Sequence, residues 1–223
     1  MKRIITKLKT LFKVSFLKTI RVNLKYFGVK YVFKPIILVS KNTKIYRLKG
    51  KVLAENKSFG AIRVGFGFVG IVDRKYRRTI WDNDGTLEFK GTSFMGVGTK
   101  ISNTGHVTFG DNFCINANSD IICRSSIIFG EDVLISWETL IMDSDYHCIY
   151  STSDSEQKRI NPDKAIYIGN HCWIGCRCTL LKGTAVSNNT IIAAGSVISR
   201  CYKNENVIIS DSGILKDNVN WKK

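Results

Sequence analysis

Residues 168–200 read IGNHCWIGCRCTLLKGTAVSNNTIIAAGSVISR, and apolar residues recur in them at every sixth position. The same spacing returns in three groups between Phe89 and Ile141. Small residues often stand one and four positions after the apolar one. The repeat positions are Phe89, Met95, Ile101, Phe109, Ile115, Ile121, Phe129, Ile135, Ile141, Ile168, Ile174, Leu180, Val186, Ile192 and Ile198.

A six-residue period of this kind predicts a parallel β-helix. Three short strands form one triangular coil, and each apolar residue points inward and stacks on its counterpart in the next coil, about 4.8 Å away. Small residues suit the corners and the crowded interior. A β-sandwich would instead alternate polar and apolar residues, with a turn about every ten residues. We therefore predict an all-β fold, a parallel β-helix with about five regular coils.

The positive charge of the chain lies at its N-terminal end. The net charge is +16, but residues 1–54 hold fifteen Lys or Arg and no Asp or Glu, while the remaining residues carry nineteen bases and eighteen acids. We predict a basic arm, a segment of irregular coils, the hexapeptide-repeat domain and a tail, over residues 1–51, 52–88, 89–203 and 204–223.

The arm is expected to begin with a helix and to continue as an extended segment. Ile5, Leu8, Phe12 and Phe16 follow helical spacing, and basic residues gather on another face. Two interpretations stay open: the helix packs against the end of the prism, or residues 1–30 contact an acidic membrane. Nucleic acid is not an expected partner, because no recognised motif accompanies the charge.

The cysteines and the basic residues near the N-terminus indicate the cellular compartment of the protein. Lysines and arginines interrupt every apolar run near the N-terminus, so no secretory signal is predicted. Seven cysteines without such a signal indicate free thiols in a reducing cytoplasm. We expect a cytoplasmic protein, peripheral at the inner face of the membrane if the arm binds lipid.

The repeat stops once, between Ile141 and Ile168. These positions are 27 residues apart, where six or eight would continue the coil. Residues 143–167 are therefore predicted to leave the prism as a protruding loop, and long loops in compact domains are usually functional. This loop contains His147 together with Asp143 and Asp145.

Two stretches resemble a known family. Residues 168–200 resemble the C-terminal coils of hexapeptide-repeat acyltransferases. MDSDYHCIY (142–150) and RINPDKAIYIGNHCWIG (159–175) are similar to the subgroup that O-acetylates sugars in surface-polysaccharide biosynthesis. The resemblance covers residues 87–209 and implies a left-handed β-helix, a homotrimer, acetyl-CoA as co-substrate without a metal, and a saccharide or lipid-linked saccharide acceptor.

The resemblance also implies a catalytic base, because in the family a histidine at the root of this loop acts as the base. His147 is the matching residue. A neutral imidazole can take the proton of a sugar hydroxyl near neutral pH. Asp145 or Asp143 would orient the imidazole and stabilise its charged form. Asp145 is alternatively a turn-forming residue, since it also occupies a corner position of the repeat.

The resemblance places coenzyme A along the C-terminal coils, in a groove between two subunits. The matching residues here are Trp173, Gly175, Cys176, Lys182, Ala194, Gly195 and Arg200. Coil geometry alone would also explain the small residues, and a subunit contact would explain Trp173. The family's Gly-x-Pro-Ala turn is missing, because the segment that begins at Ile209 contains no proline.

Two competing interpretations remain. His171, Cys172, Cys176 and Cys178 lie close in sequence, but they lack a paired Cys-x-x-Cys arrangement, and two of the cysteines occupy small corner positions. We therefore expect no metal. The alternative function is a non-catalytic β-helical scaffold that binds an anionic membrane or polymer through residues 1–51.

Overall fold

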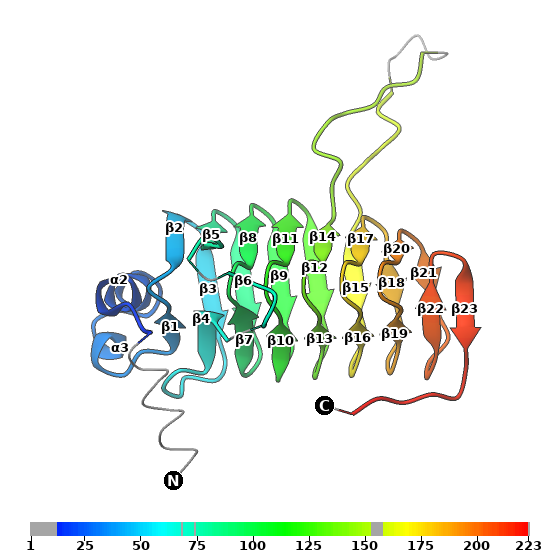
Figure 1. The fold of residues 1–223 in the computed structure, drawn as a ribbon. Coiled ribbons are helices and arrows are strands. Elements are labelled where there is room, and N and C mark those ends of the chain that lie inside the picture. The colour runs from blue at the N-terminus through cyan, green and yellow to red at the C-terminus, as the bar shows by residue number, and fades with distance from the viewer. Residues whose placement is uncertain (1–12, 68, 74, 153–157, 223) are drawn as a thin grey trace.

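The computed structural model describes residues 13–67, 69–73, 75–152 and 158–222 of the chain. The predicted helical positions Ile5, Leu8 and Phe12 lie outside these ranges. In the described part, the strands form a triangular prism with two helices at its N-terminal end (Figure 1). The fold is the left-handed parallel β-helix that the resemblance implied.

Each coil of the prism adds one strand to each of three sheets. In the described residues, the first sheet has the order β1 (Ile37–Val39), β4 (Ile62–Phe66), β7 (Ser93–Gly96), β10 (Phe113–Ile115), β13 (Leu134–Ile135), β16 (Trp173–Ile174), β19 (Ile191–Ile192), β22 (Ile208–Ser210) and β23 (Gly213–Lys216). All neighbours in it are parallel except β22 and β23, which form an antiparallel pair.

The other two sheets are parallel throughout the described residues. The second sheet contains β2 (Thr43–Leu48), β5 (Thr79–Asn83), β8 (Lys100–Asn103), β11 (Asp120–Cys123), β14 (Leu140–Met142), β17 (Thr179–Leu181) and β20 (Val197–Ile198). The third contains β3 (Lys51–Ala54), β6 (Thr86–Phe89), β9 (His106–Phe109), β12 (Ser126–Phe129), β15 (Ile166–Ile168), β18 (Ala185–Val186) and β21 (Cys201–Tyr202).

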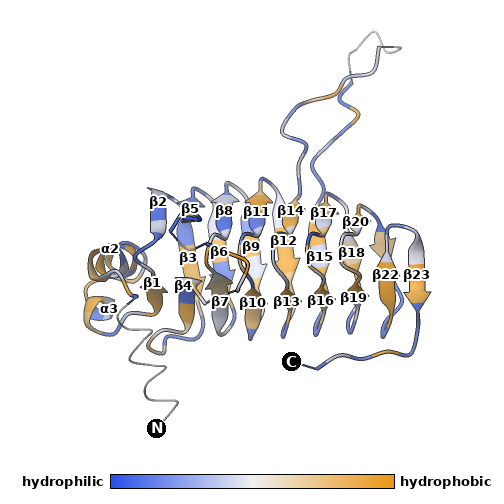
Figure 2. Ribbon diagram, in the orientation of Figure 1, coloured by the Kyte–Doolittle hydropathy of each residue, from blue (hydrophilic) through white to orange (hydrophobic). Residues whose placement is uncertain are grey.

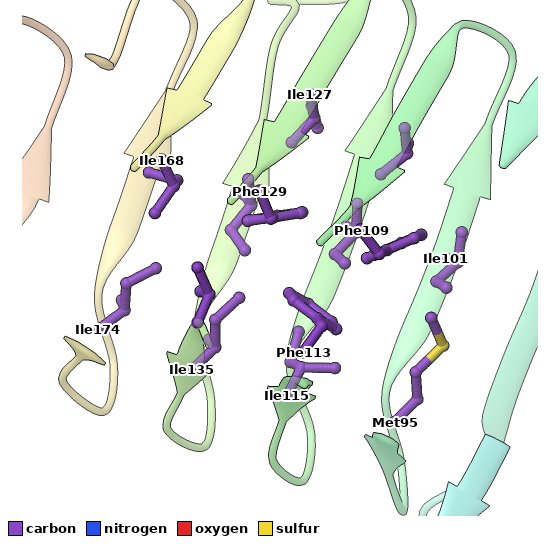
Figure 3. Close-up of a cluster of buried hydrophobic side chains, with 14 of the residues drawn as sticks. Met95, Ile101, Phe109, Phe113, Ile115, Ile127, Phe129, Ile135, Ile168 and Ile174 are labelled. Atoms are coloured by element: carbon purple, nitrogen blue, oxygen red, sulfur yellow. The ribbon is translucent and has the colours of Figure 1, made fainter. Parts of the chain in front are cut away.

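The predicted inward stacking is confirmed residue by residue. Phe89 pairs with Phe109, and Phe109 pairs with Phe129, in successive coils. The rings of Phe89 and Phe109 are nearly parallel, 4.7 Å apart between centroids. Figure 3 shows this apolar core as rows of side chains along the prism axis. Every one of the fifteen repeat positions is at most 1% exposed, so the six-residue period is the period of the core.

The corners are built from a position of the repeat that the sequence analysis did not single out. The third residue after the inward apolar one adopts a positive φ in most coils, for example 50° at His171 and 59° at Arg177. Asparagine and aspartate tolerate this left-handed conformation better than other side chains do. The remaining corners of this kind in the repeat are Asn112, Asn118, Asp132, Glu138 and Asn189, together with the glycines Gly98, Gly183 and Gly195.

Cys172 and Cys178 fill the small inward position next to two of these corners. Both are buried, and their thiols donate to the carbonyls of Ser187 and Ala193, at 3.3 and 3.1 Å. Burial raises the pKa of Cys172 to about 11. These thiols are therefore neutral parts of the core.

The helices α2 (Phe16–Phe27) and α3 (Lys30–Phe33) close the N-terminal end of the prism. Asn23 bonds to the edge of β1 that faces away from β4: its amide donates to the Ile37 carbonyl, and its oxygen accepts from the Ile36 and Ile37 amides. A sheet edge left open would expose unpaired backbone groups, and α2 supplies their partners. The helix α2 thus packs one face against the end of the prism, and its opposite face stays exposed.

Parallel coils begin at Ile37, and the first two complete coils precede the regular hexad spacing. Their strands contain register shifts, between Ile45 and Arg47 and between Val64 and Phe66. At the other end, β22 and β23 form a hairpin, after which the chain returns along the first sheet (Figure 1). Figure 2 shows apolar residues in the strands of the later coils, whereas β2 and β5 are mainly hydrophilic.

Candidate active site

The predicted loop is present, and it leaves the prism at the corner between β14 and β15 (Figure 1). Asp143 stands at its base and is fully buried. Its two carboxylate oxygens accept hydrogen bonds from the backbone amides of Arg124 and Ser125, both at 2.8 Å. Asp143 therefore fixes the loop to the preceding coil, and its carboxylate is not directed at His147.

Asp145 begins a tight turn that presents the histidine. The His147 amide donates to the Asp145 carbonyl at 2.7 Å, and Tyr146 between them has a φ of +62°. A positive φ in an aromatic residue is strained and persists only where its surroundings hold it. Here the guanidinium of Arg124 lies over the Tyr146 ring, 5.3 Å from its centroid, and donates to the Tyr146 carbonyl.

Asn161 ties the two branches of the loop together, and it was missed in the sequence analysis. Its amide donates to the His147 carbonyl and to the Asp145 carboxylate, both at 2.8 Å. Its oxygen accepts from the Ile149 amide at 2.7 Å. The signal available in the sequence was the Asn-Pro pair at 161–162, which is typical of a turn.

Lys182 supports this turn from the next coil. Its ammonium donates to the Asp145 carboxylate at 2.5 Å and to the carbonyls of Asn161 and Pro162 at 3.3 Å. The ammonium of Lys182 holds the pKa of Asp145 below its usual range, with a smaller contribution from Asn161. Lys182 was expected at the coenzyme, and the structure places it under the loop.

The structure leaves the imidazole of His147 exposed above this anchor. Within the described residues it has no hydrogen-bond partner, and neither predicted carboxylate reaches it. Asp145 positions the histidine through the backbone and through Asn161, and no carboxylate pairs with the His147 imidazole among the residues that the structure describes.

The residues expected at the coenzyme gather mainly at a different corner of the prism, between the first and second sheets. Gly175 and Cys176 follow β16, and Ala194 and Gly195 follow β19 in the next coil. The Gly195 amide donates to the Cys176 carbonyl at 2.9 Å. A side chain at Gly175 would lie 2.6 Å from the Ala194 nitrogen, so coil packing requires this glycine. Gly195 has a φ of +79° and open space around it.

Trp173 lies on the first sheet beside this corner, and its indole nitrogen donates to the Ser136 hydroxyl at 3.1 Å. Arg200 lies at the same corner as the loop, two coils further on. Its guanidinium donates to the Tyr202 hydroxyl at 2.9 Å and to the Asp211 carbonyl. The predicted site residues are therefore divided between two edges of the prism, with the second sheet between them.

The C-terminal tail packs next to Trp173, a feature that the sequence analysis left open. Trp221 stacks on the His171 ring with centroids 4.5 Å apart. His171 donates to the Asp132 carboxylate at 2.5 Å, and this hydrogen bond, with a smaller one to the Trp221 carbonyl, raises the pKa of His171. The backbone of the tail thus partly covers the first sheet at the level of β16.

Comparisons with known proteins relate the repeat to a family of bacterial transferases. Residues 165–200 match the family described as bacterial transferase hexapeptide (six repeats). The putative lipopolysaccharide biosynthesis O-acetyl transferase WbbJ of Escherichia coli K12 is 28% identical over 134 residues, 56% of this chain and 68% of that protein. The polysialic acid O-acetyltransferase of Neisseria meningitidis is 38% identical over 68 residues, 30% of this chain and 31% of that protein.

A solved structure shows the same fold. The polysialic acid-specific acetyltransferase NeuO superimposes with a TM-score of 0.61 at 19% identity, over 83% of this chain and 80% of that one. The sequence similarities bear on activity, and the structural likeness bears on the fold. Together with the repeat and the loop that interrupts it, these comparisons show that the chain is similar to hexapeptide-repeat acetyltransferases.

Proposed function

We propose that the protein transfers an acetyl group from acetyl-CoA to a hydroxyl of a saccharide acceptor, in the biosynthesis of a capsule, O-antigen or exopolysaccharide. The observation that carries the proposal is His147, which is exposed on a strained and anchored turn at the root of the loop. The acceptor class is supported by relatives named for lipopolysaccharide biosynthesis and for polysialic acid.

His147 acts as general base in a direct transfer. Its neutral imidazole takes the proton of the acceptor hydroxyl while the oxygen attacks the thioester carbonyl. The carbon–sulfur bond then breaks, and the imidazolium returns the proton to the sulfur of the leaving coenzyme. Asp145 is a positioning residue, because its carbonyl accepts the His147 amide and its carboxylate bonds to Asn161 and Lys182.

The acetyl-CoA site is supported by the exposed corner at Ala194 and Gly195. A Cβ added at Gly195 would meet no atom within 4 Å, so the backbone there is open to close approach by a pantetheine arm. Trp173 is 37% exposed beside this corner, and Cys176 is partly exposed at it. Arg200 lies at the other edge, below the loop, and supplies a positive charge for a phosphate of the coenzyme. We assign Lys182 to the loop anchor and Gly175 to coil packing.

The assembly proposed for this function is a homotrimer. The loop and the Gly195 corner lie on two edges of one prism, and the edges of a triangle point away from each other. A groove between two chains brings the loop edge of one chain to the Gly195 edge of its neighbour. Cytoplasmic location remains part of the proposal, supported by the seven described cysteines, which form no disulfide with one another.

Release of free coenzyme A from acetyl-CoA, measured against a panel of sugars and lipid-linked sugars, tests the proposal. We expect His147→Ala to lower kcat by about 10²–10⁴-fold while acetyl-CoA binding persists in calorimetry. His106→Ala is the matched control, since His106 is a half-exposed histidine on β9 that bonds to Glu88. Unchanged turnover in His147→Ala would refute the base, and absent acetyl-CoA binding would refute the donor.

A further inference from the structure

The outward face of α2 is apolar where a surface helix usually carries polar residues. Thr19, Val22 and Asn23 face the prism and are buried. On the other side Leu17 is 82% exposed and Leu24 is 47% exposed. The cap face, as this surface is called below, consists of the exposed residues Phe16, Leu17, Leu24, Val29 and Phe33.

Exposed basic residues surround the cap face. Residues 1–54 contain no acidic side chain, so no carboxylate of this segment neutralises them. The exposed bases on α2, on α3 and directly beside them are Lys13, Arg21, Lys25, Lys30 and Lys34. Exposed apolar side chains framed by positive charge are typical of helices that lie in the headgroup region of anionic membranes.

A pocket of about 370 Å³ opens beside this face, between α2 and β2. Its basic lining residues are Lys18, Arg21, Lys41, Lys44 and Arg78, and they define the basic pocket. The other lining residues are Asn42, Thr43 and Ile45, so none of those that line it is acidic. In the described part of the chain, none of its five basic side chains forms an ion pair with a carboxylate.

The basic pocket is already partly ordered. The Lys18 ammonium donates to the carbonyls of Lys41 and Thr43, at 2.7 and 2.5 Å. Burial, together with the nearby charge of Arg78, lowers the pKa of Lys18. Like charges held this close repel one another, and an anion in the pocket would relieve the repulsion. Phosphate suits such a pocket, because guanidinium and ammonium groups both bind its oxygens.

We propose that the N-terminal end of the prism docks on a membrane that contains anionic phospholipids. The cap face enters the boundary between headgroups and acyl chains, and the basic pocket receives a lipid phosphate. Arg21 borders both surfaces, so the apolar contact and the phosphate contact belong to one binding face. Exposed leucine, valine and phenylalanine favour lipid over nucleic acid, whose phosphates would be bound by charge without an apolar face.

The attachment would be peripheral. No helix in the described ranges is long and apolar enough to cross a membrane. Figure 1 shows both helices together at one end of the prism. If the proposed trimer has parallel prisms, the three cap faces lie in one plane, so three weak contacts act together.

Co-sedimentation of the full chain with vesicles tests the proposal. We expect binding to phosphatidylcholine vesicles that contain phosphatidylglycerol, weakened by salt, and little binding to phosphatidylcholine alone. The double variant Leu17→Gln with Phe33→Gln should bind at least about tenfold more weakly, because buried apolar area is lost. The pocket double variant Lys44→Gln with Arg78→Gln should lose about fivefold for each charge removed.

Leu215→Gln is the matched control, because Leu215 is 57% exposed at the opposite end of the prism and should bind vesicles like the wild type. Unfolding curves check that each variant folds. Equal vesicle binding by the cap-face variant and the wild type would overturn the proposal. Stabilisation by inorganic phosphate without vesicle binding would also overturn it, by assigning the pocket to a free phosphate. Self-association that disappears in the cap-face variant, without vesicle binding, would assign the face to a second copy.

Discussion

Asn161→Ala separates positioning of the histidine from stability of the prism. Asn161 is 8% exposed, and it makes hydrogen bonds to the His147 carbonyl and the Ile149 amide. At about 1 kcal/mol for each net bond, removing both favours opening of the loop by about 2 kcal/mol, or about thirtyfold. The further hydrogen bond of Asn161 to the solvent-exposed carboxylate of Asp145 is not included in this free energy. We expect kcat/KM to fall by up to about thirtyfold.

Hydrogen exchange at the Ile160 amide reports the opening directly. This amide donates to the Ile149 carbonyl at 2.9 Å, and the substitution removes neither atom. Its exchange should accelerate by about the same thirtyfold factor, while the thermal unfolding of the prism stays unchanged. Asn188→Ala is the matched control, because Asn188 bonds between coils at a corner away from the loop. Unaltered exchange with reduced activity would refute the positioning argument.

Three further predictions concern the core, the corner and the tail. Phe109→Ala removes a ring stacked between two others and should cost about 3–5 kcal/mol in chemical denaturation. Gly175→Ala forces its Cβ to 2.6 Å from a backbone nitrogen in the next coil and should lower the unfolding temperature, whereas a wild-type value would contradict the coil-packing role. The raised pKa of His171 contributes stability below about pH 6.5 that is lost as the pH rises through its folded-state value. The tail should therefore loosen as the pH rises through the folded-state pKa of His171, seen in Trp221 fluorescence, and Asp132→Asn should move the transition to lower pH.

The stacked core could be predicted from the sequence because a single rule acts at every sixth position. Phe109 must match the residue twenty positions before and after it, so the spacing alone gives the pairing. The first two coils do not follow this rule. Their strands shift register at Arg47 and Phe66, so inward residues no longer recur at a constant interval.

The loop could also be predicted, because it interrupts the period. The partners of its carboxylates could not be, since they depend on how the loop folds. Asp143 still lies at the corner of its coil and bonds to the coil before it. Asp145 lies beyond the corner and bonds to residues that are distant in sequence, Asn161 and Lys182. Their positions in the sequence do not distinguish these two aspartates. Only Asp145, however, accepts the His147 amide at its carbonyl and so holds the turn of His147.

The division of the site between two edges leads to a last prediction, on mixed assemblies. His147→Ala removes the base at one edge, and Gly195→Asp puts a charged side chain into the open space at the other. Each variant alone should be inactive. When the two are unfolded and reassembled together in equal amounts, each chain has about an even chance of supplying an intact edge, so about one quarter of the sites between neighbours should be intact.

Coenzyme A release by the mixed assembly, compared with wild type, measures this fraction. A site built from both edges of a single chain would give no recovery, because every chain in the mixture carries one defect. Mixing without unfolding is the control, since assemblies that do not exchange chains should stay inactive. Recovery near one quarter would therefore locate catalysis between chains, and absence of recovery in reassembled, folded protein would refute the shared groove.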